Sequence, residues 1–136
     1  MLMRLDFTSL EKALDSLHRG IQRSQQAPKD EELRDAVIKR FEYTYELCWK
    51  MLKRQLELES PTPSLVDALS FRDVLREAAQ VGILKDIERW MDYREMRNIT
   101  SHTYDDAKAR SVYDAAVEFY NDASALLKAL EGRSHD

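Results

Sequence analysis

The sequence predicts an all-α protein folded as an antiparallel, up-and-down bundle of about five helices. Apolar residues recur every three or four positions along most of the chain, which is the spacing of one helix face. The chain of 136 residues contains only 3 glycines and 3 prolines, so few positions interrupt a helix. No segment alternates apolar and polar residues in the way that a half-buried strand does.

Length and composition fit one soluble domain, which we expect to span residues 1–136. Hydrophobic residues make up 43% of the chain and charged residues 34%, as in ordinary helical proteins. The net charge of −4 gives no general attraction for nucleic acid, so RNA contact would need a local basic patch. The start, MLMRLDFTSL, lacks the apolar run of a signal peptide, and no stretch is long enough to span a bilayer. We therefore expect a cytoplasmic protein with no membrane partner.

The first two helices are predicted at about residues 6–25 and 31–58. In the first, Thr8 with Glu11 three positions later fits a capping box. In the second, a broad apolar stripe predicts contact with more than one neighbouring helix. Cys48 lies on that stripe and is predicted to be a core residue rather than a nucleophile. As the only cysteine, it also excludes an intrachain disulfide and a cysteine-based zinc site.

The third helix is predicted at about residues 70–81. A proline-containing break at residues 60–64 precedes it, since proline disfavours helical geometry in the residue before it. Ser70 and Asp73 resemble an N-terminal cap. Gly82 stands where a glycine commonly ends a helix in the left-handed conformation.

The fourth and fifth helices are predicted at about residues 86–99 and 105–130. Residues 98–101 are weak helix formers whose side chains compete for backbone hydrogen bonds, so the fourth helix should end there. The acidic pair at residues 105–106 complements the dipole at the start of the fifth helix. Gly132 is expected to close that helix.

The corner between the fourth and fifth helices, REMRNITSHTYDD, is the strongest candidate for a functional site. The apolar stripe of the fourth helix leads in register to Arg94 and then to Asn98, and Arg97 borders the same face. A core-facing Arg and Asn need partners, which could be carboxylates, a second subunit or a bound anion. For Arg97 and His102 taken singly, an ion pair and a helix cap are the more common roles.

The residues R-N-I-T-S-H-T-Y resemble the R-x4-H-x-Y motif of the HEPN superfamily. Three segments in this order also resemble one branch of it, the nucleotidyltransferase substrate-binding proteins: FEYTYELCWKMLKRQLE, SFRDVLREAAQVG and MRNITSHTYDD. The similarity covers about residues 41–120. One departure is Phe71, which stands where a proline is expected at the start of the third helix. This departure does not touch the polar corner.

The resemblance implies a HEPN-like helical bundle that forms a two-fold homodimer or a higher even oligomer. It implies a partner, a minimal nucleotidyltransferase encoded nearby, for which this chain would be the substrate-binding subunit. In related toxin–antitoxin pairs the HEPN protein is a metal-independent endoribonuclease, and the nucleotidyltransferase silences it by AMPylation of the motif tyrosine. The resemblance thus leaves two activities open, a binding subunit and a ribonuclease, and implies no cofactor.

Carried over by position, the resemblance makes Arg97 and His102 the catalytic pair and Tyr104 the AMP acceptor. Asn98 matches the polar residue that often follows the arginine, and Arg94 is a supporting candidate on the same face. The residues in themselves leave Tyr104 an alternative role as a half-buried aromatic at a helix start. No arrangement of histidines or acidic residues predicts a metal site.

The chemistry of these residue types fits RNA cleavage. Attack by the 2′-OH needs a base, an acid and a cation near the phosphate, and imidazole and guanidinium supply these. One His102 cannot serve as base and acid in the same step, so a dimer would have to supply a second copy. The alternative is a non-catalytic homodimeric adaptor or nucleotide-binding scaffold. On either reading, Trp49, Trp90, Tyr43 and Tyr45 are predicted to serve core or dimer packing rather than base stacking.

Overall fold

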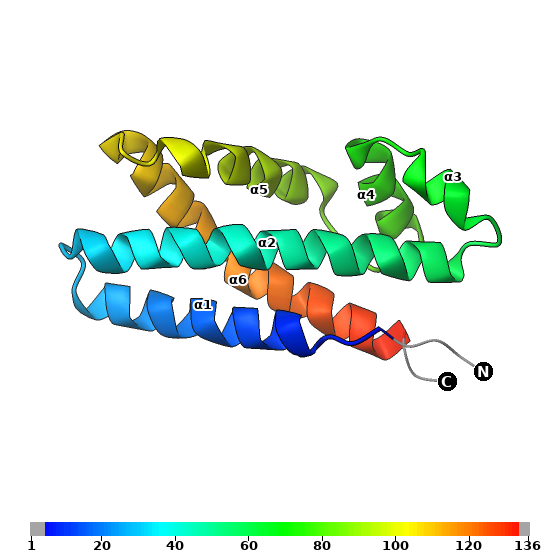
Figure 1. Ribbon diagram of the computed structural model, residues 1–136, viewed down its shortest axis with the longest axis horizontal. Helices are drawn as coiled ribbons and strands as arrows, with labels where there is room; N and C mark the ends of the chain where they lie inside the picture. The colour runs from blue at the N-terminus through cyan, green and yellow to red at the C-terminus, as the bar shows by residue number, and fades with distance from the viewer. Residues whose placement is uncertain (1–4, 134–136) are drawn as a thin grey trace.

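The computed structural model describes residues 5–133, and every regular element in this range is helical. The elements are α1 (Thr8–Gln26), α2 (Glu31–Glu59), α3 (Pro63–Asp67), α4 (Phe71–Gln80), α5 (Ile87–Ile99), the 3₁₀ turn η1 (Thr100–His102) and α6 (Asp106–Arg133). The four longer helices, α1, α2, α5 and α6, run in alternating directions, and α3 and α4 lie together at one end (Figure 1). The predicted all-α, up-and-down bundle is therefore confirmed.

Two predicted helix signals are wrong, and both concern helix ends. Thr8 is the first residue of α1 rather than its cap, because the buried Phe7 precedes it and Asp6 Oδ1 accepts a hydrogen bond from the Thr8 amide at 2.9 Å. Gly132 does not close α6, which continues to Arg133. The Arg133 guanidinium holds this end in place by pairing with Glu59 and by donating to a backbone carbonyl.

The predicted break before the third helix contains a short helix, α3, that the sequence pattern did not predict. Pro63 is the first residue of α3, a position where proline is tolerated because no intrahelical N–H is needed there. The signals around α4 are confirmed. Ser70 Oγ accepts a hydrogen bond from the Asp73 amide at 3.2 Å, and Gly82 has a φ of +86°, which favours glycine.

The ring of Phe119 on α6 is the centre of the core. It is fully buried and makes edge-on contacts with Phe41 of α2, at 5.0 Å between ring centroids, and with Tyr93 and Trp90 of α5, at 5.1 and 5.7 Å. Edge-to-face contacts of this kind add stability beyond area burial. This one side chain therefore joins α2, α5 and α6. Cys48 is also fully buried, which confirms it as a core residue, and burial raises the pKa of its thiol.

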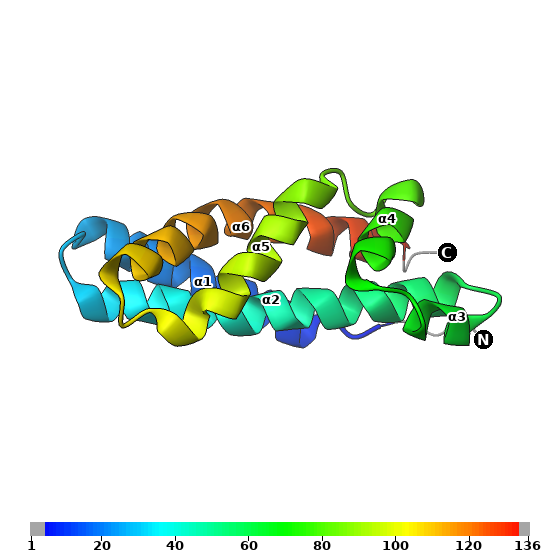
Figure 2. The ribbon, with the colours of Figure 1, turned by 90° about the horizontal axis from the view of Figure 1, so that it is seen from above.

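The helices α1 and α2 approach each other closely at Gly20. A Cβ atom at this position would lie 2.9 Å from Arg40 Nη1, which donates a hydrogen bond to the Ser16 carbonyl at 2.8 Å. Glycine therefore allows the arginine of α2 to reach the backbone of α1. Against this pair, α5 crosses obliquely above α2 and α6, as Figure 2 shows. None of the helices within residues 5–133 is both long and apolar enough to cross a bilayer.

We predict that Phe119→Ala lowers the free energy of unfolding by about 3–5 kcal/mol, because it leaves a cavity next to the rings of Phe41, Trp90 and Tyr93. Urea denaturation followed by circular dichroism measures this change. Leu65→Ala is the control, since Leu65 is 62% exposed and its loss should cost less than about 0.5 kcal/mol. A loss of similar size in both variants would contradict the central role of Phe119.

Candidate functional site

The core face of α5 differs from the predicted one. Trp90 and Tyr93 are its buried residues, whereas Arg94 and Asn98 are exposed. The prediction that Arg94 and Asn98 continue a core-facing stripe is therefore wrong. The physical reason is that the aromatic contacts of Trp90 and Tyr93 with Phe119 set the rotation of α5 and turn the polar positions outward.

These outward-turned positions border a depression of about 360 Å³ between α2, α4 and α5. We call it the α2–α5 depression. Its lining residues are Tyr45, Glu46, Trp49, Phe71, Arg94, Arg97 and Asn98. Three of the five predicted site residues thus share one open surface. His102 and Tyr104 do not line it and lie on the turn that follows α5.

Arg97 is held in the depression by Glu46 of α2. The distance from Arg97 Nε to Glu46 Oε1 is 2.5 Å, and both side chains are 40% exposed. The Nε–H bond does not point at this oxygen, so buried Nε has a charge partner but no hydrogen-bond acceptor among the described residues. Arg97 therefore has one of the partners that the sequence left open, a carboxylate. The remaining guanidinium N–H groups are its means of contacting an anion.

Arg94 has an aromatic neighbour instead of a carboxylate. Its Cζ lies 4.1 Å from the centroid of the Phe71 ring, which in turn lies 4.6 Å from the ring of Trp49. A guanidinium over an aromatic face is attracted by the ring quadrupole. Side chains from α2, α4 and α5 thus stack in sequence beside Arg97.

The turn after α5 is tied to α2 by Thr100. Its hydroxyl donates to Glu42 Oε2 at 2.6 Å and also lies 2.7 Å from the Arg97 carbonyl. The hydrogen bond from Thr100 lowers the pKa of the Glu42 carboxyl, with smaller contributions from Lys39 and from the charge of Arg97. This contact joins the end of α5 to the same face of α2 that carries Glu46.

His102 and Tyr104 form a separate, exposed pair on the turn. The Tyr104 side chain is 85% exposed, so the alternative of a half-buried packing residue is wrong. Its hydroxyl lies 3.4 Å from His102 Nδ1, and the two rings meet edge to face at 5.9 Å. The His102 imidazole is exposed as well, and only the backbone carbonyl of His102 takes part in the turn, accepting from the Asp105 amide. Both side chains are open to a ligand or a partner protein.

The start of α6 fixes the far side of this turn. Asp105 Oδ1 accepts hydrogen bonds from the amides of Ala107 and Lys108, at 3.0 and 3.2 Å, and thereby caps the helix. Asp106 Oδ1 pairs with Arg34 Nη1 of α2 at 2.8 Å. These acidic residues serve the helix end, as the sequence predicted, and they hold the turn against the start of α2.

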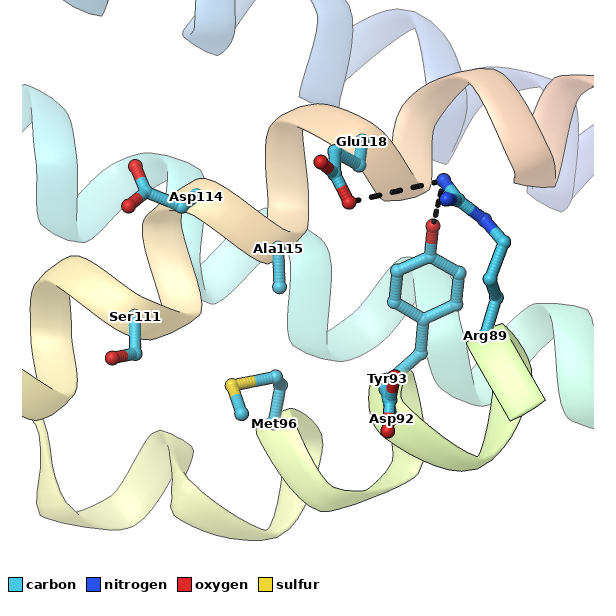
Figure 3. A pocket seen from close by; sticks show the side chains of 8 residues that line it. All are labelled: Arg89, Asp92, Tyr93, Met96, Ser111, Asp114, Ala115 and Glu118. Atoms are coloured by element: carbon cyan, nitrogen blue, oxygen red, sulfur yellow. Dashed lines mark hydrogen bonds and ion pairs between the residues drawn. The ribbon is translucent and has the colours of Figure 1, made fainter.

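A second depression, of about 300 Å³, lies between α5 and α6 and is unsuited to an anion (Figure 3). Its lining includes three carboxylates: Asp92, Asp114 and Glu118. Arg89 is the one cation in that lining, and it pairs with Glu118 and with Asp122, while Tyr93 also reaches Asp122. Within residues 5–133, no group of three or more His, Cys, Asp or Glu side chains is placed to hold a metal ion.

Glu46 and Phe71 are neighbours of the site that the sequence pattern did not predict. Glu46 lies far from Arg97 along the chain, and helical spacing gives no information on contacts between separate helices. Phe71 was noticed only as a departure from an expected proline. Its contact with Arg94 depends on how α4 packs on α5, which local sequence patterns do not reveal.

Comparisons with known proteins agree with this fold. Residues 5–132 match the family described as nucleotidyltransferase substrate binding protein like. Over 98 residues, the chain is 45% identical to a Haemophilus influenzae protein named probable ribonuclease HepT, and the match covers 72% of this chain and 67% of that protein.

Two solved structures are also similar. One, from Haemophilus influenzae, is described as having the fold of a substrate binding domain of a nucleotidyltransferase. It has a TM-score of 0.87 and 36% identity, with 93% of this chain and 99% of that chain covered. The other, from Thermus thermophilus, has a TM-score of 0.72 and 30% identity, with 89% and 98% covered.

We predict that Thr100→Val lowers the free energy of unfolding by about 1 kcal/mol at neutral pH, because it removes the hydrogen bond to Glu42. The folded state lowers the pKa of Glu42, so ionised Glu42 stabilises the fold above the ordinary glutamate pKa of about 4.3. This contribution is lost as the pH falls through that value and then through the lowered pKa. The difference between variant and wild type should therefore shrink in acid, as urea midpoints measured from pH 7 to pH 3 would show.

The matched control is Thr103→Val. The Thr103 hydroxyl donates to the Thr100 carbonyl at 3.2 Å and makes no hydrogen bond with a carboxylate of residues 5–133. Its stability difference from the wild type should not change with pH. If the stability difference between Thr100→Val and the wild type is also independent of pH, the hydrogen bond from Thr100 does not lower the pKa of Glu42.

Proposed function

This chain belongs to the nucleotidyltransferase substrate binding protein-like family, and we propose that it is the HEPN partner of a minimal nucleotidyltransferase encoded nearby. We further propose that the two form a toxin–antitoxin pair in which this chain is a metal-independent endoribonuclease and Tyr104 is the site of AMPylation. The similarity to a probable ribonuclease, at 45% identity, supports the activity.

The observation that carries the proposal is the contact between His102 and Tyr104. The motif histidine and the motif tyrosine lie side by side on one exposed turn, 3.4 Å apart between Nδ1 and the hydroxyl. Arg97 lies less than two helical turns earlier, with a partly exposed guanidinium. A cation for phosphate, an imidazole for proton transfer and an accessible phenol for modification thus occur on one continuous stretch of chain.

The proposed cleavage follows from these groups. The 2′-oxygen attacks the adjacent phosphorus, the bond to the 5′-oxygen breaks, and a 2′,3′-cyclic phosphate forms. One imidazole takes the proton of the 2′-OH, and another gives a proton to the departing 5′-oxygen. Arg97 stabilises the charge that develops on the phosphate oxygens.

The two imidazoles come from two copies of the chain. Within residues 5–133, His18 is the other histidine, and it stacks on Tyr120 at 4.8 Å, away from the corner. We therefore propose a two-fold dimer, or a higher even oligomer, in which both corners face one groove and each supplies His102 and Arg97.

Modification of Tyr104 accounts for control by the partner. The phenolic oxygen attacks the α-phosphorus of ATP, the bond to the β-phosphate bridge breaks, and pyrophosphate leaves while the phenol proton passes to a base. The product places an adenylate next to His102, because the phenol already contacts that imidazole. The added phosphate and base then obstruct access of RNA to the imidazole.

A second candidate is a non-catalytic adaptor that presents a substrate to the nucleotidyltransferase. The ion pair of Arg97 with Glu46 favours it, since the guanidinium charge is already partly neutralised in the single chain. On this alternative Arg97 stabilises the packing of α5 on α2. Activity measurements on variants of the corner separate the two candidates.

We predict that Arg97→Ala and His102→Ala each lower the rate of RNA cleavage by at least about 100-fold, the usual scale for loss of an acid–base or electrostatic group. The assay uses purified protein and single-stranded RNA in EDTA, with products separated by electrophoresis. Arg19→Ala is the matched control, since this exposed arginine lies on α1 and, among residues 5–133, pairs only with Asp15 of its own helix.

Cleavage that persists in both variants would contradict the assigned catalytic pair. Mixing the wild type with an excess of His102→Ala adds a test of the dimer. Because the proposed mechanism needs the imidazoles of both subunits, mixed dimers should be inactive, and the activity should fall below that of the same amount of wild type alone.

We predict that incubation with the nucleotidyltransferase and ATP adds AMP to the wild type and not to Tyr104→Phe. Peptide mass spectrometry locates the adduct, and the modified protein should lose its cleavage activity. Tyr43→Phe is the control, because Tyr43 is also exposed but its hydroxyl donates to Ser16. An adduct on another residue, with Tyr104 unmodified, would contradict the assignment.

A further inference from the structure

The stack of Trp49, Phe71 and Arg94 has features that packing alone does not require. Its members come from α2, α4 and α5, with ring centroids 4.6 Å apart and the guanidinium 4.1 Å from the Phe71 centroid. Unlike the fully buried rings around Phe119, both aromatic side chains remain partly exposed and Arg94 is exposed. The rings of Trp49 and Phe71 are tilted by 34° to each other, and the stack presents an aromatic surface that is partly accessible to water.

The charge around this stack favours an anionic ligand. Arg94 has no carboxylate within ion-pair distance among residues 5–133, and the other cation of the depression, Arg97, pairs with the only acid in its lining, Glu46. The depression thus carries one net positive charge in a chain whose net charge is −4. This is a local basic patch of the kind that RNA contact requires here.

Stacking and hydrogen bonding meet in the same depression. The bases of single-stranded RNA are recognised by stacking on aromatic rings or on arginine planes, and by hydrogen bonds to their edges. The Arg94 guanidinium carbon lies over the Phe71 ring, and Arg94 is exposed, so the side of the guanidinium away from the ring is open to a base. The exposed Asn98 amide, in the same lining, offers both a donor and an acceptor.

We propose that the α2–α5 depression is a binding subsite for one nucleobase of single-stranded RNA, with the adjoining phosphate at Arg97. The inference rests on the proposed function and adds a substrate contact to it. Phe71 supports the Arg94 guanidinium from one side, and the base stacks on its other side.

RNA binding with and without one base tests the subsite. The protein carries His102→Ala to prevent cleavage, and fluorescence anisotropy measures its affinity for a labelled single-stranded RNA and for a series with one abasic nucleotide at successive positions. Phe71→Leu and Arg94→Gln should each weaken binding of intact RNA by about 5-fold to 100-fold, as loss of one stacked base does. One abasic position should weaken binding by the parent protein most. With the RNA that lacks this base, Phe71→Leu and Arg94→Gln should cause little further loss of affinity.

Two control variants separate stacking from other effects. Phe71→Tyr keeps the ring and should bind intact RNA as the parent does. Arg76→Gln removes one positive charge from an exposed position of α4, where the arginine pairs with Asp73, and it should not change the sensitivity to the abasic nucleotide. The inference is overturned if Phe71→Leu and Arg94→Gln bind intact RNA normally, or if they weaken intact and abasic RNA equally.

These outcomes differ from failure of the ribonuclease proposal. In one outcome, cleavage is lost in Arg97→Ala while the effect of Phe71→Leu on RNA affinity is the same at every abasic position. This result would overturn the subsite and leave the ribonuclease proposal in place. If the effect of Phe71→Leu depends on one base but the wild type does not cleave RNA, the subsite remains and the protein is an RNA-binding adaptor. Absence of any RNA binding by the parent protein would overturn both.

Discussion

The edge-on contacts of the Phe119 ring are the constraint on which the arrangement of the corner depends. They join α6 to Phe41 of α2 and to Trp90 and Tyr93 of α5. Once two rings of α5 point at Phe119, the rotation of that helix is fixed. Arg94 and Asn98 then point outward, whereas Arg97, four residues after Tyr93, stays partly buried and pairs with Glu46 of α2. The position of the polar residues is therefore a consequence of aromatic packing in the core and needs no binding partner to maintain it.

The helix α5 consequently presents two different surfaces to its neighbours. Toward α6 it borders a depression with Asp92, Asp114 and Glu118, which repels anions (Figure 3). Toward α2 and α4 it carries Arg94 and Arg97 beside aromatic rings. Separation of charge across one helix allows an acidic protein to offer a basic surface locally. Glu46 limits the strength of that surface, because a phosphate must compete with its carboxylate for Arg97.

The sequence was sufficient to predict the helices and much less informative about contacts between them. Periodicity and end signals such as Ser70 and Gly82 predicted five helices, whereas α3 was missed because Pro63 was interpreted only as an interruption. The motif identified Arg97, His102 and Tyr104 as candidates. It did not predict the exposure of Arg94 or its contact with Phe71, because the rotation of α5 is set by residues on other helices. Local patterns contain no such long-range information.

The alternating course of the four long helices also separates the ends of the bundle from the corner. The first residues of α1 and the last residues of α6 lie toward one end of the molecule, whereas the turn with His102 and Tyr104 lies at the other (Figure 1). A fluorescent protein fused at either terminus, or attachment of either terminus to a sensor chip, would leave this turn facing the solution. The geometry thus suits the molecule to immobilisation in a defined orientation.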